Sequence, residues 1–153
     1  MLTYWVMFLL PAMVALMNET QRTRALAGGE SETPVGAWIA VGIVLTLLIG
    51  FRYEVGGDWF NYVFILDNVA GLMLDEVFLL SDPGYQLLNW LSLELDLDIF
   101  GVNLLAGAIF AIGLVVFCRN LPRPWLALAV AVPYLVIVVA MGYSRQGVAL
   151  GLA

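Results

Sequence analysis

The sequence predicts an all-α, polytopic membrane protein, and three observations support this fold class. First, 63% of the 153 residues are hydrophobic and the mean hydropathy is +0.97, whereas only 12% are charged, which is low for a soluble domain. Second, the apolar residues gather in four uncharged runs of about 16 to 19 residues, near the lower limit for crossing a bilayer. Third, four of the six arginines lie in two of the links between these runs, whereas nine of the twelve acidic residues lie in another.

Each of the four apolar runs is expected to be a membrane-spanning helix. Pro11 and Pro133 lie inside two of them, and membrane helices tolerate proline better than soluble helices do. A signal peptide is disfavoured for the first run, because no basic residue precedes it and a polar stretch separates it from the nearest small-residue motif, Ala25-Leu26-Ala27. The predicted spans are residues 2–17, 35–51, 100–118 and 125–141.

The chain ends in a stretch, GYSRQGVALGLA at 142–153, that resembles the opening of a fifth helix. About 12 residues are too few to cross a bilayer, which needs roughly 20. We therefore expect residues 1–153 to be one membrane domain that forms the N-terminal part of a longer polytopic protein.

Arginine placement predicts the orientation of the spans. The links 18–34 and 119–124 carry two arginines each, whereas segment 52–99 carries one arginine and nine acidic residues. With four spans, both basic links lie on one side, which the positive-inside rule makes cytoplasmic. The N-terminus, segment 52–99 and the chain from residue 142 onward are then outside.

The outer segment, 52–99, is expected to hold two short helices at the membrane interface. Residues 58–74 are rich in aromatic and aliphatic side chains, and the leucines of 85–95 recur at helical spacing. Residues 91–100 alternate with period two, which favours a strand, but no partner strand is evident. We therefore predict a helix that ends near Leu95.

Several kinds of function are disfavoured by composition. The net charge of −6, with six arginines and no lysine, disfavours nucleic-acid binding. The absence of histidine excludes Ser-His-Asp catalysis and His-ligated zinc. Asp96-Leu97-Asp98 spells a DxD pattern, which we interpret as solvated carboxylates, so neither a metal nor a cofactor is predicted. The single cysteine, Cys118, is expected to be a small buried hydrophobe.

Two polar clusters are candidates for chemistry. In GFRYEVGGDWFNY (50–62), Arg52 ends the second span, Gly56-Gly57 predicts a tight turn, and Asp58 begins a helix with Tyr62 on the same face. In YSRQ (143–146), Arg145 lies outside, against the positive-inside rule.

These clusters allow two interpretations. Arg52 and Arg145 form a shared site for a polyanion, since guanidinium groups bind phosphate oxygens bidentately. Alternatively, the arginines only reach lipid headgroups, Asp58 caps a helix and Tyr62 is an interfacial anchor.

Three motifs resemble those of the EpsG family of membrane proteins. Arg52, Val55-Gly56, Asp58 and Tyr62 match R-x-x-V-G-x-D-x-x-x-Y. DPGYQLL at 82–88 is similar to the family's acidic-x-G-[YF]-x-L-L segment, and SRQG at 144–147 is similar to its S-R-Q-x motif. The motifs occur in family order and spacing, so the resemblance covers the chain from about Gly36 onward.

The resemblance implies a multi-pass protein of the bacterial inner membrane, similar in role to Wzy-type polymerases. Such a glycosyltransferase-type enzyme joins repeat units carried on undecaprenyl pyrophosphate into exopolysaccharide, capsule or O-antigen. Its partners would be that lipid-linked glycan, membrane lipids, and the flippase and chain-length regulator of the assembly system. The alternative is a non-catalytic membrane subunit of an assembly or transport system.

The resemblance also implies roles for individual residues. Arg52 and Arg145 would stabilise the departing pyrophosphate, and Asp58 would orient Arg52 or accept the proton of the attacking hydroxyl. Trp59 and Tyr62 would stack on sugar rings. The full set of predicted substrate-binding residues is Tyr53, Trp59, Tyr62, Tyr85, Ser144 and Gln146.

Overall fold

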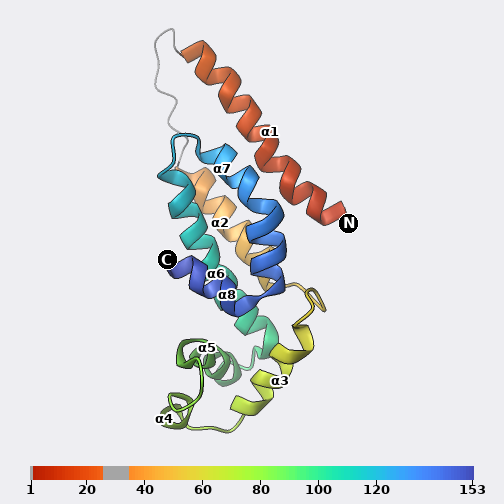
Figure 1. Cartoon of the computed structure of the whole chain (residues 1–153), viewed down its shortest axis with the longest axis vertical. Helices are drawn as coiled ribbons and strands as arrows, with labels where there is room; N and C mark the ends of the chain where they lie inside the picture. Colours follow the sequence, from red (N-terminus) through yellow and green to blue (C-terminus); the bar gives the residue numbers. More distant parts are fainter. Residues whose placement is uncertain (1, 26–34) are drawn as a thin grey trace.

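In the computed structural model, which describes residues 2–25 and 35–153, the described chain is helical throughout and holds no strand. Long helices pack side by side, and three shorter helices gather beyond one end of them (Figure 1). In chain order the elements are α1 (Leu2–Ala25), α2 (Val35–Gly50), α3 (Trp59–Val69), α4 (Leu74–Val77), α5 (Pro83–Glu94), α6 (Asp98–Arg119), α7 (Pro124–Ala131), the π-helix η1 (Val132–Ala140) and α8 (Ser144–Leu152).

One described helix, α6, is both long enough and apolar enough to cross a membrane, with 22 residues. Three apolar segments, Tyr4–Met17, Val35–Gly50 and Pro124–Ala140, are shorter. The all-helical class is therefore confirmed, whereas passage of α6 and of the three shorter helices through a membrane remains a prediction.

The helix boundaries refine the predicted ones. Helix α1 continues through Ala25, past the expected end of its apolar run, and residues 26–34 of the first predicted link lie outside the described residues. Helix α5 begins at Pro83, because proline suits a first turn whose N–H groups have no helical partner. It ends at Glu94, close to the predicted end at Leu95. The helix is therefore confirmed, and the period-two alternation of residues 91–100 does not form a strand.

The last apolar run departs from a regular α-helix at Pro133. Proline has no N–H and crowds the preceding turn, so the ladder of hydrogen bonds cannot continue unchanged. The run changes to π-helical form at Val132 and keeps it through Ala140, directly before the site described below.

Helix α6 is the centre of the packing, since it contacts α2, α5, α7 and α8. Its glycines permit close approach: a methyl group added at Gly113 would strike the backbone of Gly151 in α8, and one at Gly107 would lie 3.1 Å from Ile49. Helix α1 packs instead against α7 and η1.

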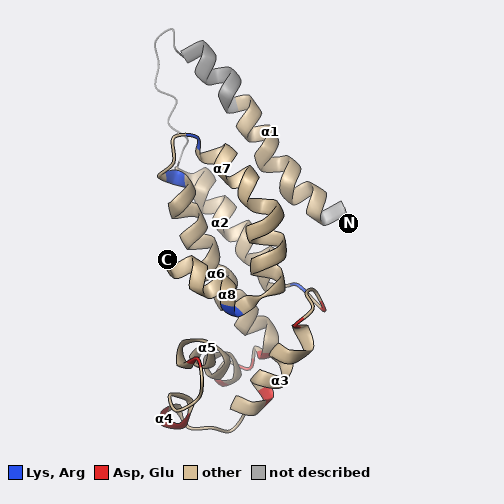
Figure 2. Ribbon diagram, in the orientation of Figure 1, with Lys and Arg blue, Asp and Glu red and all other residues tan. Residues whose placement is uncertain are grey.

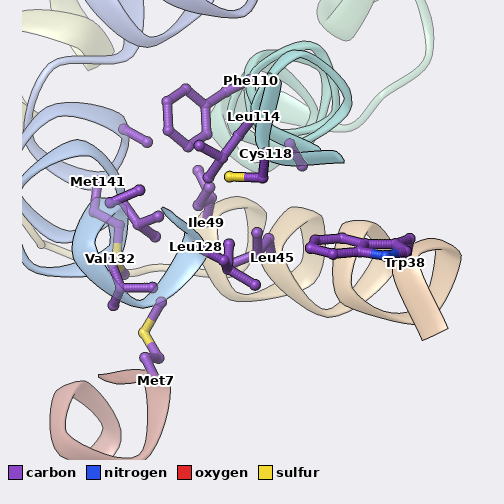
Figure 3. Packing of buried hydrophobic residues seen from close by; sticks show 14 of the residues in the cluster. Met7, Trp38, Leu45, Ile49, Phe110, Leu114, Cys118, Leu128, Val132 and Met141 are labelled. Carbon is purple, nitrogen blue, oxygen red and sulfur yellow. The ribbon is translucent and has the colours of Figure 1, made fainter. Parts of the chain in front are cut away.

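Buried side chains from α1, α2, α6, α7 and η1 form one apolar core (Figure 3). Trp38 of α2 stacks on Trp125 of α7 with ring centroids 4.5 Å apart. Cys118 is free and fully buried in this core, as its apolar surroundings in the sequence predict. A second, smaller core joins α3, α5 and α6 through residues that include Tyr62, Tyr85 and Val102.

Charges separate along the molecule as the sequence predicts. Figure 2 shows basic residues at the α6–α7 link, at one end of the long helices, and the described acidic residues at the other end, around α3 to α5. Two arginines lie at the acidic end: Arg145 pairs with Asp82, and Arg52 donates a hydrogen bond to the neighbouring Ser144. This distribution is the one that the positive-inside rule associates with an outward-facing acidic end.

We predict that Ser81 faces outward and Asn120 faces the cytoplasm. Both side chains are exposed, and they lie at opposite ends of the charge distribution. With Cys118 replaced by Ser, a single Ser81→Cys substitution should react with a membrane-impermeant maleimide in intact spheroplasts. The matched Asn120→Cys substitution should react only after lysis. The reverse pattern would show that the orientation is wrong.

Candidate anion-binding site

Arg52 lies directly after α2, where the chain leaves the helix, and its guanidinium group turns into the protein. Only 4% of the residue is exposed. Nη1 donates a hydrogen bond to the carbonyl oxygen of Ala140 at 2.7 Å, and Nη2 donates to Asn103 Oδ1 at 3.0 Å and to Ser144 Oγ. The side chain therefore does not extend outward, as the headgroup-anchoring alternative expects.

The partners of Arg52 are all neutral. They are a main-chain carbonyl, an amide and a hydroxyl, and no carboxylate in the described part of the chain pairs with it. Burial lowers the pKa of Arg52 from its ordinary value, and the nearby Tyr85 and Tyr62 only partly oppose this effect. An arginine nevertheless stays protonated at neutral pH, so the site holds a buried positive charge without an internal counterion.

The first motif contacts the third through Arg52, and Gly56 of the first motif also contacts Gly142, just before the third motif. Gly56 has φ +98°, a conformation that favours glycine, and a Cβ there would lie 2.9 Å from Gly142 Cα. Gly142 lies two residues before Ser144, which accepts a hydrogen bond from Arg52. The loop after α2 is thus seated against the start of α8.

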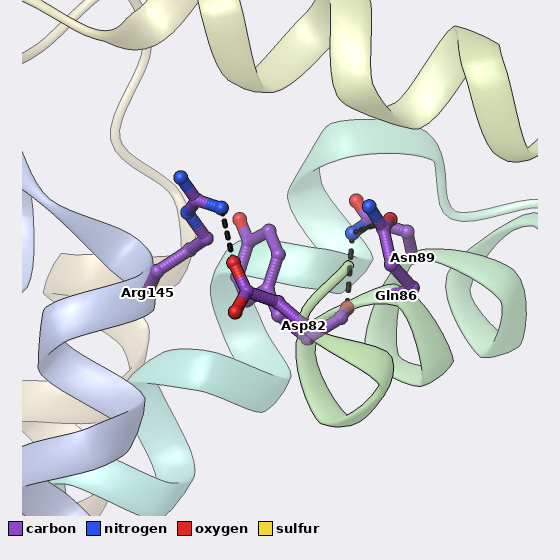
Figure 4. Close-up of polar contacts among 5 residues, drawn as sticks. Asp82, Gln86, Asn89 and Arg145 are labelled. Carbon is purple, nitrogen blue, oxygen red and sulfur yellow. Dashed lines mark hydrogen bonds and ion pairs between the residues drawn. The ribbon is translucent and has the colours of Figure 1, made fainter. Parts of the chain in front are cut away.

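The second and third motifs meet through Arg145. Its Nη1 donates to Asp82 Oδ2 and forms an ion pair between the N-termini of α8 and α5 (Figure 4). Both side chains are accessible, at 43% and 58% exposure. An exposed pair of this kind stabilises a fold by about 0 to 1 kcal/mol, so Arg145 is free to exchange Asp82 for another anion.

Hydrogen bonds at the start of α5 hold Asp82 and Tyr85 in place beside Arg145. Asp82, the residue before the helix, has φ +57°, and its carbonyl accepts the Tyr85 N–H at 2.9 Å. Asn89 Nδ2 donates to the Tyr85 carbonyl oxygen at 2.9 Å, and Asn89 lies close to Gln86 in Figure 4.

Two buried tyrosines lie close to both arginines. The rings of Tyr62 and Tyr85 are 5.8 Å apart, and both hydroxyls are influenced by the charges of Arg52 and Arg145. Burial raises the pKa of Tyr62 and of Tyr85 above the ordinary value, so both phenols stay protonated at neutral pH. They are available as hydrogen-bond donors and not as bases.

The other predicted site residues are placed as follows. Asp58 precedes α3, makes no hydrogen bond with its side chain to cap the helix, and forms no ion pair with Arg52 in the described structure. The prediction that Asp58 orients Arg52 is therefore wrong, because Asn103, Ser144 and the Ala140 carbonyl do so instead. Gln146 is exposed.

The aromatic residues of the first motif differ in accessibility. Trp59 and Tyr62 are both buried, so their ring faces are covered by protein, contrary to the prediction that they stack on sugars. Tyr53 packs edge-on against Trp59 with centroids 5.7 Å apart and is itself exposed. Of these three rings, Tyr53 is the one that a glycan can reach.

Asn103 is a site residue that the sequence analysis missed. It lies in α6, is 1% exposed, and accepts hydrogen bonds from Arg52 and, at 3.4 Å, from Ser144. A signal was available, because Asn103 is the one strongly polar side chain in the apolar run 100–118. Polar residues within membrane-spanning runs are costly and commonly mark functional sites.

The DxD carboxylates do not take part in this site. Asp96 and Asp98 are exposed at the turn between α5 and α6. Among the residues searched, which are the described ones, no group of three or more His, Cys, Asp or Glu side chains could hold a metal ion.

The comparison with protein families is decisive at this point. The model of the EpsG family matches residues 37–153, which include all three motifs and every side chain of the site. The chain belongs to the EpsG family. No curated protein and no solved structure matches the chain significantly. EpsG membership implies an exopolysaccharide-related, polymerase-like function, and the EpsG match begins within α2, so it excludes α1.

We predict that Gly56→Ala destabilises the site of this EpsG protein, whereas Gly57→Ala does not. A residue other than glycine at φ +98° costs about 1 to 3 kcal/mol, and the new methyl would also press on Gly142. Gly57 has open space around its Cβ position. Thermal unfolding of the purified variants in detergent measures both effects, and equal unfolding temperatures would contradict the prediction.

Proposed function

We propose that this EpsG protein is a multi-pass polysaccharide polymerase of the bacterial inner membrane. It joins repeat units carried on undecaprenyl pyrophosphate in exopolysaccharide, capsule or O-antigen biosynthesis, and its site faces away from the cytoplasm. Family membership supports the polymerase-like role, and the charge distribution supports the orientation.

One observation carries the proposal: Arg52 is a buried cation whose partners are all neutral. Burying an unpaired charge is costly, and a protein retains such a charge where an anion joins it. A lipid-linked pyrophosphate supplies that anion. Arg145, whose charge acts on the same two tyrosines, is exposed and can contact a second phosphoryl group when it leaves Asp82.

In this proposal the site catalyses transfer of a glycan from the lipid-linked donor to an acceptor glycan. A hydroxyl of the acceptor glycan attacks the anomeric carbon of the donor, the bond from that carbon to the pyrophosphate oxygen breaks, and the lipid pyrophosphate departs with the bonding electron pair. Negative charge grows on the departing oxygen, and Arg52 is held rigidly by three hydrogen bonds to stabilise it.

The remaining residues have supporting roles in this proposal. Asp58 is half-buried and free of ion pairs in the described structure, so its carboxylate can take the proton of the attacking hydroxyl. Tyr53 offers an exposed aromatic face to a sugar ring. A flippase would deliver the donor, and a chain-length regulator would act on the product.

We predict that Arg52→Lys, Arg145→Lys and Asp58→Asn each impair polymer formation. Lysine keeps the charge but loses the planar fork that serves several oxygen atoms at once. Loss of one stabilising donor at a developing oxyanion typically costs about 10²- to 10³-fold in rate. Asn caps helices as well as Asp does, so a defect in Asp58→Asn would reflect lost proton transfer.

The test introduces each substitution at the chromosomal locus and compares surface polysaccharide by gel and glycan analysis at equal membrane protein levels. Arg119→Lys, at the exposed cytoplasmic end of α6, is the matched control and should leave the polymer unchanged. Wild-type polymer from all three site variants, or an unchanged surface glycan after deletion of the gene, would refute the proposal. It would favour a non-catalytic membrane subunit.

A further inference from the structure

Asn103 uses only half of its amide group within the protein. Its Oδ1 accepts hydrogen bonds from Arg52 Nη2 and Ser144 Oγ, and so joins α6 to the loop after α2 and to the start of α8. Its Nδ2 is buried and has no hydrogen-bond partner. Both atoms belong to one rigid amide, so the unused donor lies beside the guanidinium group.

Two further buried polar groups of the same cluster lack partners. Arg52 Nε is one. The Tyr85 hydroxyl is the other: it has no partner of ordinary hydrogen-bond geometry, and a weak interaction with the Ser144 side chain only partly offsets the rise of its pKa on burial. Arg52, Asn103 and Tyr85 are each more than nine-tenths buried. Buried donors are nearly always satisfied in native proteins, so three together indicate a missing acceptor.

The residue at position 103 decides whether the counterion of Arg52 comes from within the protein. An aspartate there would accept from Arg52 as Asn103 does, but would also neutralise the guanidinium charge. The amide instead holds Arg52 in place and leaves its charge uncompensated. Asn103 thus contributes a hydrogen-bond donor at a position where an aspartate would contribute a negative charge.

We infer that Asn103, Arg52 and Tyr85 form an internal oxyanion site that receives a phosphoryl oxygen, and that Asn103 makes this site selective for an external anion. The ligand oxygen would accept from Asn103 Nδ2, Arg52 Nε and the Tyr85 hydroxyl, and would be the counterion of Arg52. This inference deepens the proposed function, and rests on it only for naming lipid-linked pyrophosphate as the source.

The experiment measures thermal unfolding of the purified full-length protein in detergent. One arm adds inorganic pyrophosphate and the other adds short-chain phosphatidylglycerol, whose phosphodiester represents a lipid headgroup. Each raises the unfolding temperature only if it binds the folded state. A shift with pyrophosphate identifies the polymerase substrate as the source, and a shift with phosphatidylglycerol alone identifies the headgroup.

The decisive variant is Asn103→Asp. The introduced carboxylate pairs with Arg52, so without added anion the protein should unfold at or above the wild-type temperature. At least tenfold more pyrophosphate should be needed for half of the wild-type shift. The matched control is Asn120→Asp, which adds the same charge at the exposed far end of α6 and should keep the wild-type response.

Tyr85→Phe is a second variant, which keeps the inference testable if Asn103→Asp does not fold. It removes a hydroxyl that has no hydrogen bond of ordinary geometry and interacts at most weakly with Ser144, so folding without added anion should be largely preserved. The anion-induced shift should be smaller than that of the wild type. An unshifted wild type in both arms, or an undiminished shift in either Asn103→Asp or Tyr85→Phe, would overturn the inference.

These outcomes are separable from those of the polymer test. A normal surface glycan after gene deletion, together with a pyrophosphate shift that Asn103→Asp abolishes, would refute the polymerase and leave the oxyanion site standing. Loss of the polymer after gene deletion, without any anion-induced shift in the unfolding temperature, would support the polymerase and refute the oxyanion site.

Discussion

The burial of the Arg52 guanidinium is the constraint around which the rest of the structure is arranged. A charge so far from water needs several hydrogen-bond acceptors, and they come from α6, η1 and the first residue of α8. Because these acceptors are distant in the sequence, Arg52 fixes how the last two helical segments sit on α6. The same interaction that orders the fold also leaves a positive charge open to an anion.

The sequence predicted the helical class, the position of each apolar helix and the separation of charges, because these depend on composition and local periodicity. It also singled out Arg52 and Arg145. It did not predict Asn103, the ion pair of Arg145 with Asp82, or the burial of Trp59 and Tyr62. These features depend on contacts between segments far apart in the chain, which no local pattern encodes.

The glycines of the first motif have a physical explanation in these contacts. Gly56 allows the loop to turn with positive φ and to touch Gly142, which brings Arg52 to the start of α8. The tight turn that the sequence predicts is therefore also a packing surface.

Helix α8 touches α6 near both of its ends, through Ser144 and Asn103 at one and through Gly151 and Gly113 at the other. These attachments are about 10 Å apart along the helix, roughly two turns. Contact near both ends restrains α8 from pivoting on α6, so the two helices should move as one body and keep Asn103 and Ser144 together.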